Sequence, residues 1–180
     1  MLACLAEFRS RERSDSAVGQ LDLDRLEVHT VKRQRRRTGD FIIIRLDTSR
    51  FALGRVLEEP YVGFYDLELT SREVSLVDVD DARILFKLAV MNNTITAGRW
   101  EVVGNRSLSE DLSVLPRLFR QDPISGELFI VEGEKEWPAN REEVATLERA
   151  AVWSAEHVED RLRDHFAGKP NVWVESLRPR

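Results

Sequence analysis

In the stretch Asp40-Phe41-Ile42-Ile43-Ile44-Arg45-Leu46, apolar residues occupy both alternating sets of positions of a two-residue repeat. Such a run predicts a β-strand that is buried on both faces. A polar turn follows at residues 47–50, and Phe51 to Leu57 then supplies a second strand, so the pair predicts a hairpin. Gly54 interrupts the second strand and predicts a bulge or a close approach of the backbone.

Short apolar alternations continue along the chain and predict more strands. They fall at residues 61–67, 83–91, 98–103, 116–121 and 127–131. Pro123 and Gly126 mark a tight connection between the last two. About seven short strands favour a small twisted barrel or an SH3-like antiparallel sheet.

The pattern changes to a helical period after residue 139. Asn140 has Glu143 three residues later, which is the spacing of a capping box at the start of a helix. Ser154 predicts the cap of a second helix, which Gly168 ends. Residues 172–174 predict an edge strand. The expected fold is therefore mainly β with two C-terminal α-helices, α+β overall.

Composition bounds the class of protein. The chain has 180 residues, of which 42% are hydrophobic and 33% are charged, and its net charge is −5. We expect one β-rich domain at 38–180 with a helical tail, after a flexible or partly helical basic segment at 1–37. The single cysteine, Cys4, excludes an internal disulfide. The chain shows neither a membrane-length apolar run nor a signal-peptide pattern, so we expect a cytoplasmic protein.

Sequence motifs for catalysis and cofactor binding are missing. The chain contains no glycine-rich phosphate loop and no GxSxG nucleophile motif. Its histidines are His29, His157 and His165, and the last two lie eight residues apart, whereas helical metal pairs favour a spacing of four. We therefore predict no catalytic residue, no metal and no cofactor. A small enzyme that uses the pair Asp78 and Asp81 is a rival hypothesis without a supporting motif.

Acidic side chains concentrate between residues 66 and 81. Only Arg72 opposes them within this stretch. Three interpretations are open: an electronegative surface for a basic partner, a metal site built from hard oxygen ligands, and a solvated loop. Tyr61 and Tyr65 share a strand face nearby and could add a hydrophobic centre, although a single aromatic residue is more often part of the core. The predicted partner-binding residues are Asp66, Glu68, Glu73, Asp78, Asp80, Asp81, Tyr61 and Tyr65.

A basic run precedes the first strand. Residues 32–37, Lys32-Arg33-Gln34-Arg35-Arg36-Arg37, hold five cations. They suggest either a nucleic-acid- or ribosome-associated SH3-like module or a solvated lead-in to the strand. The acidic net charge of the whole chain argues against nucleic acid as the partner.

The hairpin also resembles a known family. The segment Thr38-Gly39-Asp40 leads into the first strand, and Phe51-Ala52-Leu53-Gly54-Arg55-Val56 forms the second. This pattern resembles the immunity protein 26 family of bacterial polymorphic toxin systems, over about residues 35–131. The resemblance implies a non-enzymatic cytosolic protein that binds a cognate toxin, here expected to be basic, and neutralises it by occluding its active site. It implies no specific binding residues.

Overall fold

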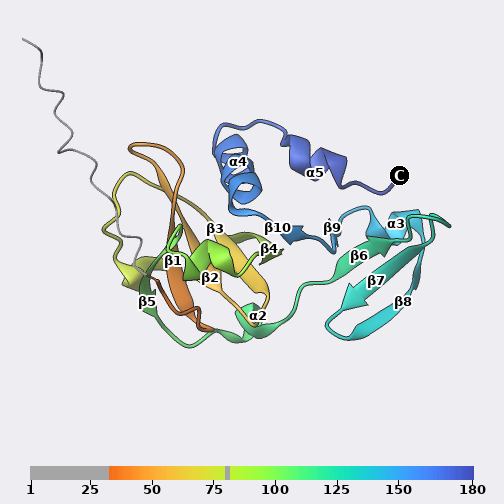
Figure 1. The fold of residues 1–180 in the computed structure, drawn as a ribbon, viewed down its shortest axis with the longest axis horizontal. Coiled ribbons are helices and arrows are strands. Elements are labelled where there is room, and N and C mark those ends of the chain that lie inside the picture. The colour runs from red at the N-terminus through yellow and green to blue at the C-terminus, as the bar shows by residue number, and fades with distance from the viewer. Residues whose placement is uncertain (1–32, 80–81) are drawn as a thin grey trace, which may run out of the picture. The chain divides into compact units, whose positions relative to one another are not determined.

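The computed structural model describes residues 33–79 and 82–180, which form two β-sheets and several short helices (Figure 1). The larger sheet has the strand order β10-β4-β3-β2-β1-β5, and the smaller has the order β8-β7-β6-β9. The strands of the larger sheet are β1 (Asp40–Arg45), β2 (Phe51–Val56), β3 (Tyr61–Leu69), β4 (Ile84–Val90), β5 (Glu101–Asn105) and β10 (Val152–Trp153). Those of the smaller sheet are β6 (Leu118–Gln121), β7 (Leu128–Glu132), β8 (Lys135–Ala139) and β9 (Glu148–Arg149).

The predicted hairpin is confirmed. β1 and β2 pair antiparallel, with Phe41 opposite Arg55 and Arg45 opposite Phe51. The turn between them is fixed by Asp47, whose Oδ1 accepts hydrogen bonds from the backbone N–H groups of Ser49 and Arg50, each at 2.9 Å. Because a short carboxylate closes this turn, the register of the two strands is set locally.

Strand β1 is buried on both faces, as its sequence predicts. Ile42 and Ile44 belong to one core cluster, which also contains Phe64 and Trp100. Phe41 and Ile43 belong to a second cluster on the opposite face. Apolar residues on both sides of the strand therefore serve two separate cores, one on each side of the larger sheet.

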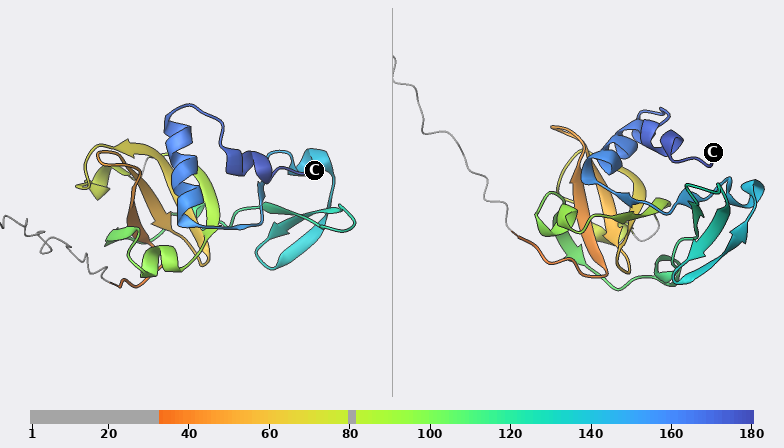
Figure 2. Two further views of the ribbon diagram at one scale, coloured as in Figure 1. Left: turned by 45° about the horizontal axis from the view of Figure 1, so that its top comes forward. Right: turned by 45° about the vertical axis from the view of Figure 1, so that its right-hand side comes forward.

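Helix α4 (Ala155–Phe166) covers one face of the larger sheet, as the views in Figures 1 and 2 agree. Val158 and Leu162 are fully buried in the same cluster as Ile42 and Ile44. Ser154 caps the helix, because its hydroxyl accepts a hydrogen bond from the His157 N–H. The predicted cap of this helix is confirmed.

The smaller sheet has its own small core, formed by Phe119, Ile130 and Val144. Residues 148–153 connect it to the larger sheet. Strand β9 pairs in parallel with β6, and four residues later β10 pairs in parallel with β4. One short segment thus adds an edge strand to each sheet.

The remaining helices are short. They are α1 (Asn93–Thr96), α2 (Glu110–Ser113), α3 (Arg141–Val144), α5 (Val172–Ser176) and the 3₁₀ helix η2 (Leu76–Val79). No helix among the described residues is long and apolar enough to cross a membrane.

The α+β class is confirmed, and each of the seven predicted strands overlaps one of β1 to β7. The expected barrel is not closed, because β5 and β10 end the larger sheet and do not pair with each other in the described part of the chain. The capping box at Asn140 is present, but the helix that it starts is a single turn. Residues 172–174, predicted as an edge strand, lie in helix α5. The prediction for the basic N-terminal segment lies mostly outside the described residues.

Gly54 confirms the predicted close approach. A Cβ atom added there would lie 2.9 Å from Cγ1 and 3.1 Å from Cδ1 of the Ile42 side chain. The ladder between β2 and β3 also shifts register between Ala52 and Gly54. The glycine is therefore required by packing against the neighbouring strand.

Candidate partner-binding site

Two of the predicted acidic residues form surface ion pairs with cations of the same chain. Asp66 accepts a hydrogen bond from Arg83 at 2.7 Å, and its other oxygen lies 2.9 Å from Nε2 of His165. The hydrogen bond with His165, and then that with Arg83, lowers the pKa of the Asp66 carboxyl below its usual value. Glu68 pairs with Arg50 at 3.1 Å. These two carboxylates therefore present less negative potential than the sequence alone suggests.

The other predicted acidic residues lie around η2. Glu73 is exposed in the loop before this 3₁₀ helix, and Asp78 lies within it. Asp80 and Asp81 lie outside the described residues. The described part of the chain contains no cluster of three or more metal-ligating side chains.

The two predicted tyrosines lie in different environments. Tyr61 is half-buried at the start of β3. Tyr65 is only 3% exposed and packs in the core cluster with Phe41 and Ile43. Tyr65 therefore belongs to the core, and its ring is not available to a partner.

The basic run is anchored to the fold at alternate residues. Gln34 Nε2 donates to the Trp100 carbonyl at 2.9 Å, and its Oε1 accepts from the Val102 N–H at 2.8 Å. Arg36 donates to the Tyr61 carbonyl at 3.1 Å, and its burial lowers its pKa. The cations between and beside them, at positions 33, 35 and 37, are exposed. Lys32 lies outside the described residues.

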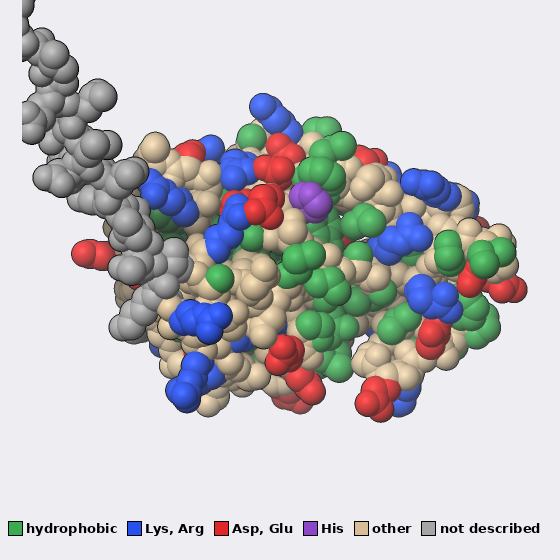
Figure 3. Space-filling view, in the orientation of Figure 1, with side chains coloured by type: hydrophobic (Ala, Val, Ile, Leu, Met, Phe, Trp, Pro, Cys, Tyr) green, Lys and Arg blue, Asp and Glu red, His purple; other side chains and the backbone are tan. Residues whose placement is uncertain are grey.

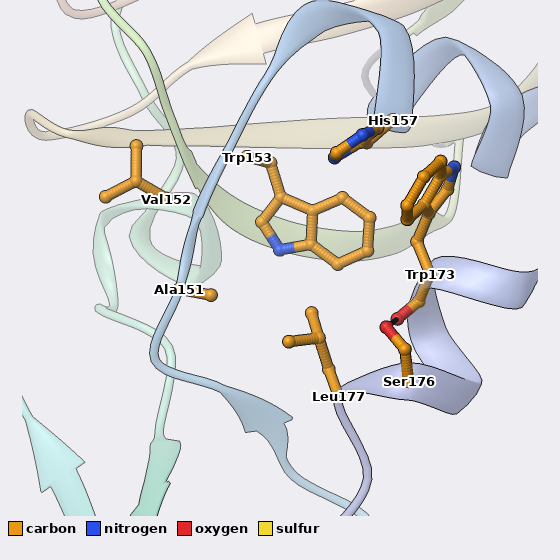
Figure 4. Close-up of a pocket in the computed structure, with 7 residues that line it drawn as sticks. All are labelled: Ala151, Val152, Trp153, His157, Trp173, Ser176 and Leu177. Carbon is orange, nitrogen blue, oxygen red and sulfur yellow. Dashed lines mark hydrogen bonds between the residues drawn. The ribbon is translucent and has the colours of Figure 1, made fainter.

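A surface pocket of about 180 Å³ lies beside β10, at the first turn of α4 and along α5 (Figure 4). Its walls are mostly apolar or aromatic. Figure 3 shows hydrophobic side chains gathered over the middle of this face, where Figure 1 places β10 and α5. The lining residues are Ala151, Val152, Trp153, His157, Trp173, Ser176 and Leu177.

The aromatic walls are held in place by neighbouring groups. The His157 and Trp173 rings stack with their centroids 3.7 Å apart and an interplanar angle of 25°. The Trp173 indole N–H donates to Asp160 at 3.2 Å, which fixes the ring at the edge of the pocket. Arg161, which pairs with Glu148, lies with its guanidinium 5.3 Å from the centre of the Trp153 ring. The pocket is thus preformed by packing and hydrogen bonds.

Sequence reasoning did not identify this pocket. It placed Trp153 before the cap of a helix and Trp173 on an edge strand, so it could not bring the two rings together. Asn171 offered a signal, because it is a favoured N-cap residue and its side chain accepts a hydrogen bond from the Val174 N–H at 3.2 Å. An N-cap at Asn171 predicts a helix, not a strand, for residues 172–174.

The described chain is thus a small α+β protein with an aromatic pocket on its surface. The model of the family "Immunity protein 26" matches residues 37–129. That range covers more than half of the chain, and the protein belongs to this family. The match spans β1 to β6 and the start of β7, so the pocket lies outside it. Comparison with curated proteins and with solved structures found no match.

Proposed function

We propose that this protein binds a cognate toxin in the cytosol and neutralises it by covering the toxin's active site. Membership of the immunity protein 26 family carries the proposal. The family region contains the hairpin and most of the buried residues of the two cores around the larger sheet, a rigid platform for a binding surface. A protein that works by occlusion needs a preformed complementary surface and no reacting groups of its own.

Two features would contribute to such an interface in different ways. Asp66 and Glu68 are paired within the protein. The other carboxylates of the stretch 66–81 would attract a basic toxin and raise the association rate. An aromatic pocket would slow dissociation, because buried aromatic contacts supply most of the binding energy of an interface. Both features are proposals for the same activity.

The test uses the toxin encoded beside the gene. Cells that express this toxin should survive when the protein is co-expressed and should die when it is replaced by an immunity protein of another system. The purified proteins should form a complex, and the toxin's activity should fall to zero at one equivalent. A toxin that forms no complex and is not inhibited would contradict the proposed function. A complex in which the toxin stays active would contradict occlusion of the active site.

A further inference from the structure

The indole N–H of Trp153 is a buried donor without a hydrogen-bond partner among the described residues. The residue is 3% exposed and lines the pocket beside α5. Figure 4 shows its nitrogen on the ring edge that faces Ala151 and Leu177. Buried indole N–H groups normally have a partner, and one that lacks it points to an acceptor supplied from outside.

The size of the pocket selects the kind of group that fits. An apolar protein cavity of about 150 Å³ binds benzene, whereas pockets for drug-sized ligands begin at roughly 300 Å³. The present pocket of about 180 Å³ therefore has room for one six-membered ring with a small substituent. The stacked rings of His157 and Trp173 offer such a ring an aromatic wall.

The rim of the pocket suits a protein partner. Val152 lines it and is 61% exposed, and Val172, which precedes the lining residue Trp173 in the chain, is 65% exposed. Exposed apolar side chains beside an aromatic pocket are typical of the centre of a protein interface. A phenol ring combines the required size with an oxygen that can accept a hydrogen bond.

We infer that the pocket receives a tyrosine side chain of a partner protein, whose ring fills the space and whose hydroxyl accepts a hydrogen bond from the Trp153 N–H. The identification of that partner as the toxin rests on the proposed function. The inference of a phenol-binding pocket does not, so the two are tested separately.

The first experiment uses p-cresol, the side chain of tyrosine, and toluene, which lacks the hydroxyl. Indole signals are followed by ¹H–¹⁵N NMR of the full chain. We expect p-cresol to bind in the millimolar range and to move the Trp153 indole proton downfield. Toluene should bind at least threefold more weakly and leave this proton without a downfield shift. Trp137 on β8 does not line the pocket, and its signal should not move.

Two matched variants locate the site. Ala151→Leu places a larger side chain in the pocket wall and should weaken p-cresol binding at least tenfold. Ala150→Leu adds the same atoms at the preceding, exposed residue outside the lining and should bind p-cresol like the wild type. The inference is overturned if p-cresol does not bind, if toluene binds as tightly, or if Ala151→Leu binds p-cresol unchanged.

The second experiment measures binding of the two variants to the toxin encoded beside the gene. Ala151→Leu should raise the dissociation rate at least tenfold, and Ala150→Leu should not. A toxin that binds both variants like the wild type would overturn its assignment as the tyrosine donor. Failure of the wild type to bind the toxin would instead overturn the proposed function, with the p-cresol result unaffected.

Discussion

Gly54 and Gly63 allow one packing argument to be tested at two neighbouring positions. A Cβ at Gly54 would lie 2.9 Å from the fully buried Ile42 side chain, whereas a Cβ at Gly63 would meet its nearest atoms at 3.6 Å. Gly54→Ala should therefore lower the free energy of unfolding by about 1–3 kcal/mol through overpacking. Gly63→Ala should change it by less than about 1 kcal/mol. Urea denaturation of both variants checks this, and equal costs would contradict it.

The environment of Asp66 predicts a measurable shift of its pKa on mutation of its neighbours. Its pKa is lowered first by its hydrogen bond with His165. His165→Ala should raise the Asp66 pKa towards the ordinary value of about 3.9, and Arg83→Ala should raise it less. Because the folded pKa is lowered, the stabilising contribution is fully present above about pH 3.9 and is lost as the pH falls through the folded pKa. Side-chain carboxyl NMR titrations measure these pKa values, and an unchanged pKa in His165→Ala would refute the assignment.

Helix α4 packs its apolar side chains against the larger sheet. Leu162 is fully buried against the larger sheet. Leu162→Ala should lower the free energy of unfolding by about 2–5 kcal/mol, because it leaves a cavity under the helix. Glu156→Ala, on the exposed side of the same helix, should change it by about 0.5 kcal/mol or less. Chemical denaturation tests the pair, and a small effect of Leu162→Ala would mean that α4 does not rest on the sheet.

Elements with a strong local signal were predictable from the sequence, and elements that depend on distant contacts were not. The side chains of β1 alternate between two cores, and the continuous apolar run in the sequence predicts this burial on both faces. The capping box at Asn140 fixes where α3 starts, but pairing of Glu148 and Arg149 with β6 ends the helical stretch early. The β-branched residues of α5 favour a strand by propensity, yet they form a helix in which Trp173 stacks on His157.

The two candidate sites of the molecule were predictable from the sequence to different extents. The acidic stretch is visible in the sequence because charge needs no fold to be counted. The pairing of Asp66 with His165 is not, because the two residues are 99 positions apart in the chain. The aromatic pocket combines residues 151–157 with residues 173–177, and most of α4 lies between these segments in the sequence. The pocket therefore forms only once the chain is folded. Long-range pairing therefore decides which of the charged and aromatic residues a partner can meet.

The last prediction concerns the charge that a toxin meets as it approaches. The triple variant Asp78→Lys, Asp80→Lys, Asp81→Lys should slow association with a basic toxin at least about tenfold at low salt, and less at high salt. Glu127, Glu134 and Glu142 are exposed in the part of the chain that carries the smaller sheet. Reversing these three to Lys changes the net charge by the same amount, so this control separates local from overall charge. Association rates measured on an immobilised toxin at two salt concentrations give the comparison. If both triple variants slow association equally, the net charge of the protein steers the toxin. If neither does, the toxin approaches a surface away from both sets of carboxylates, and the proposed role of the acidic stretch is wrong.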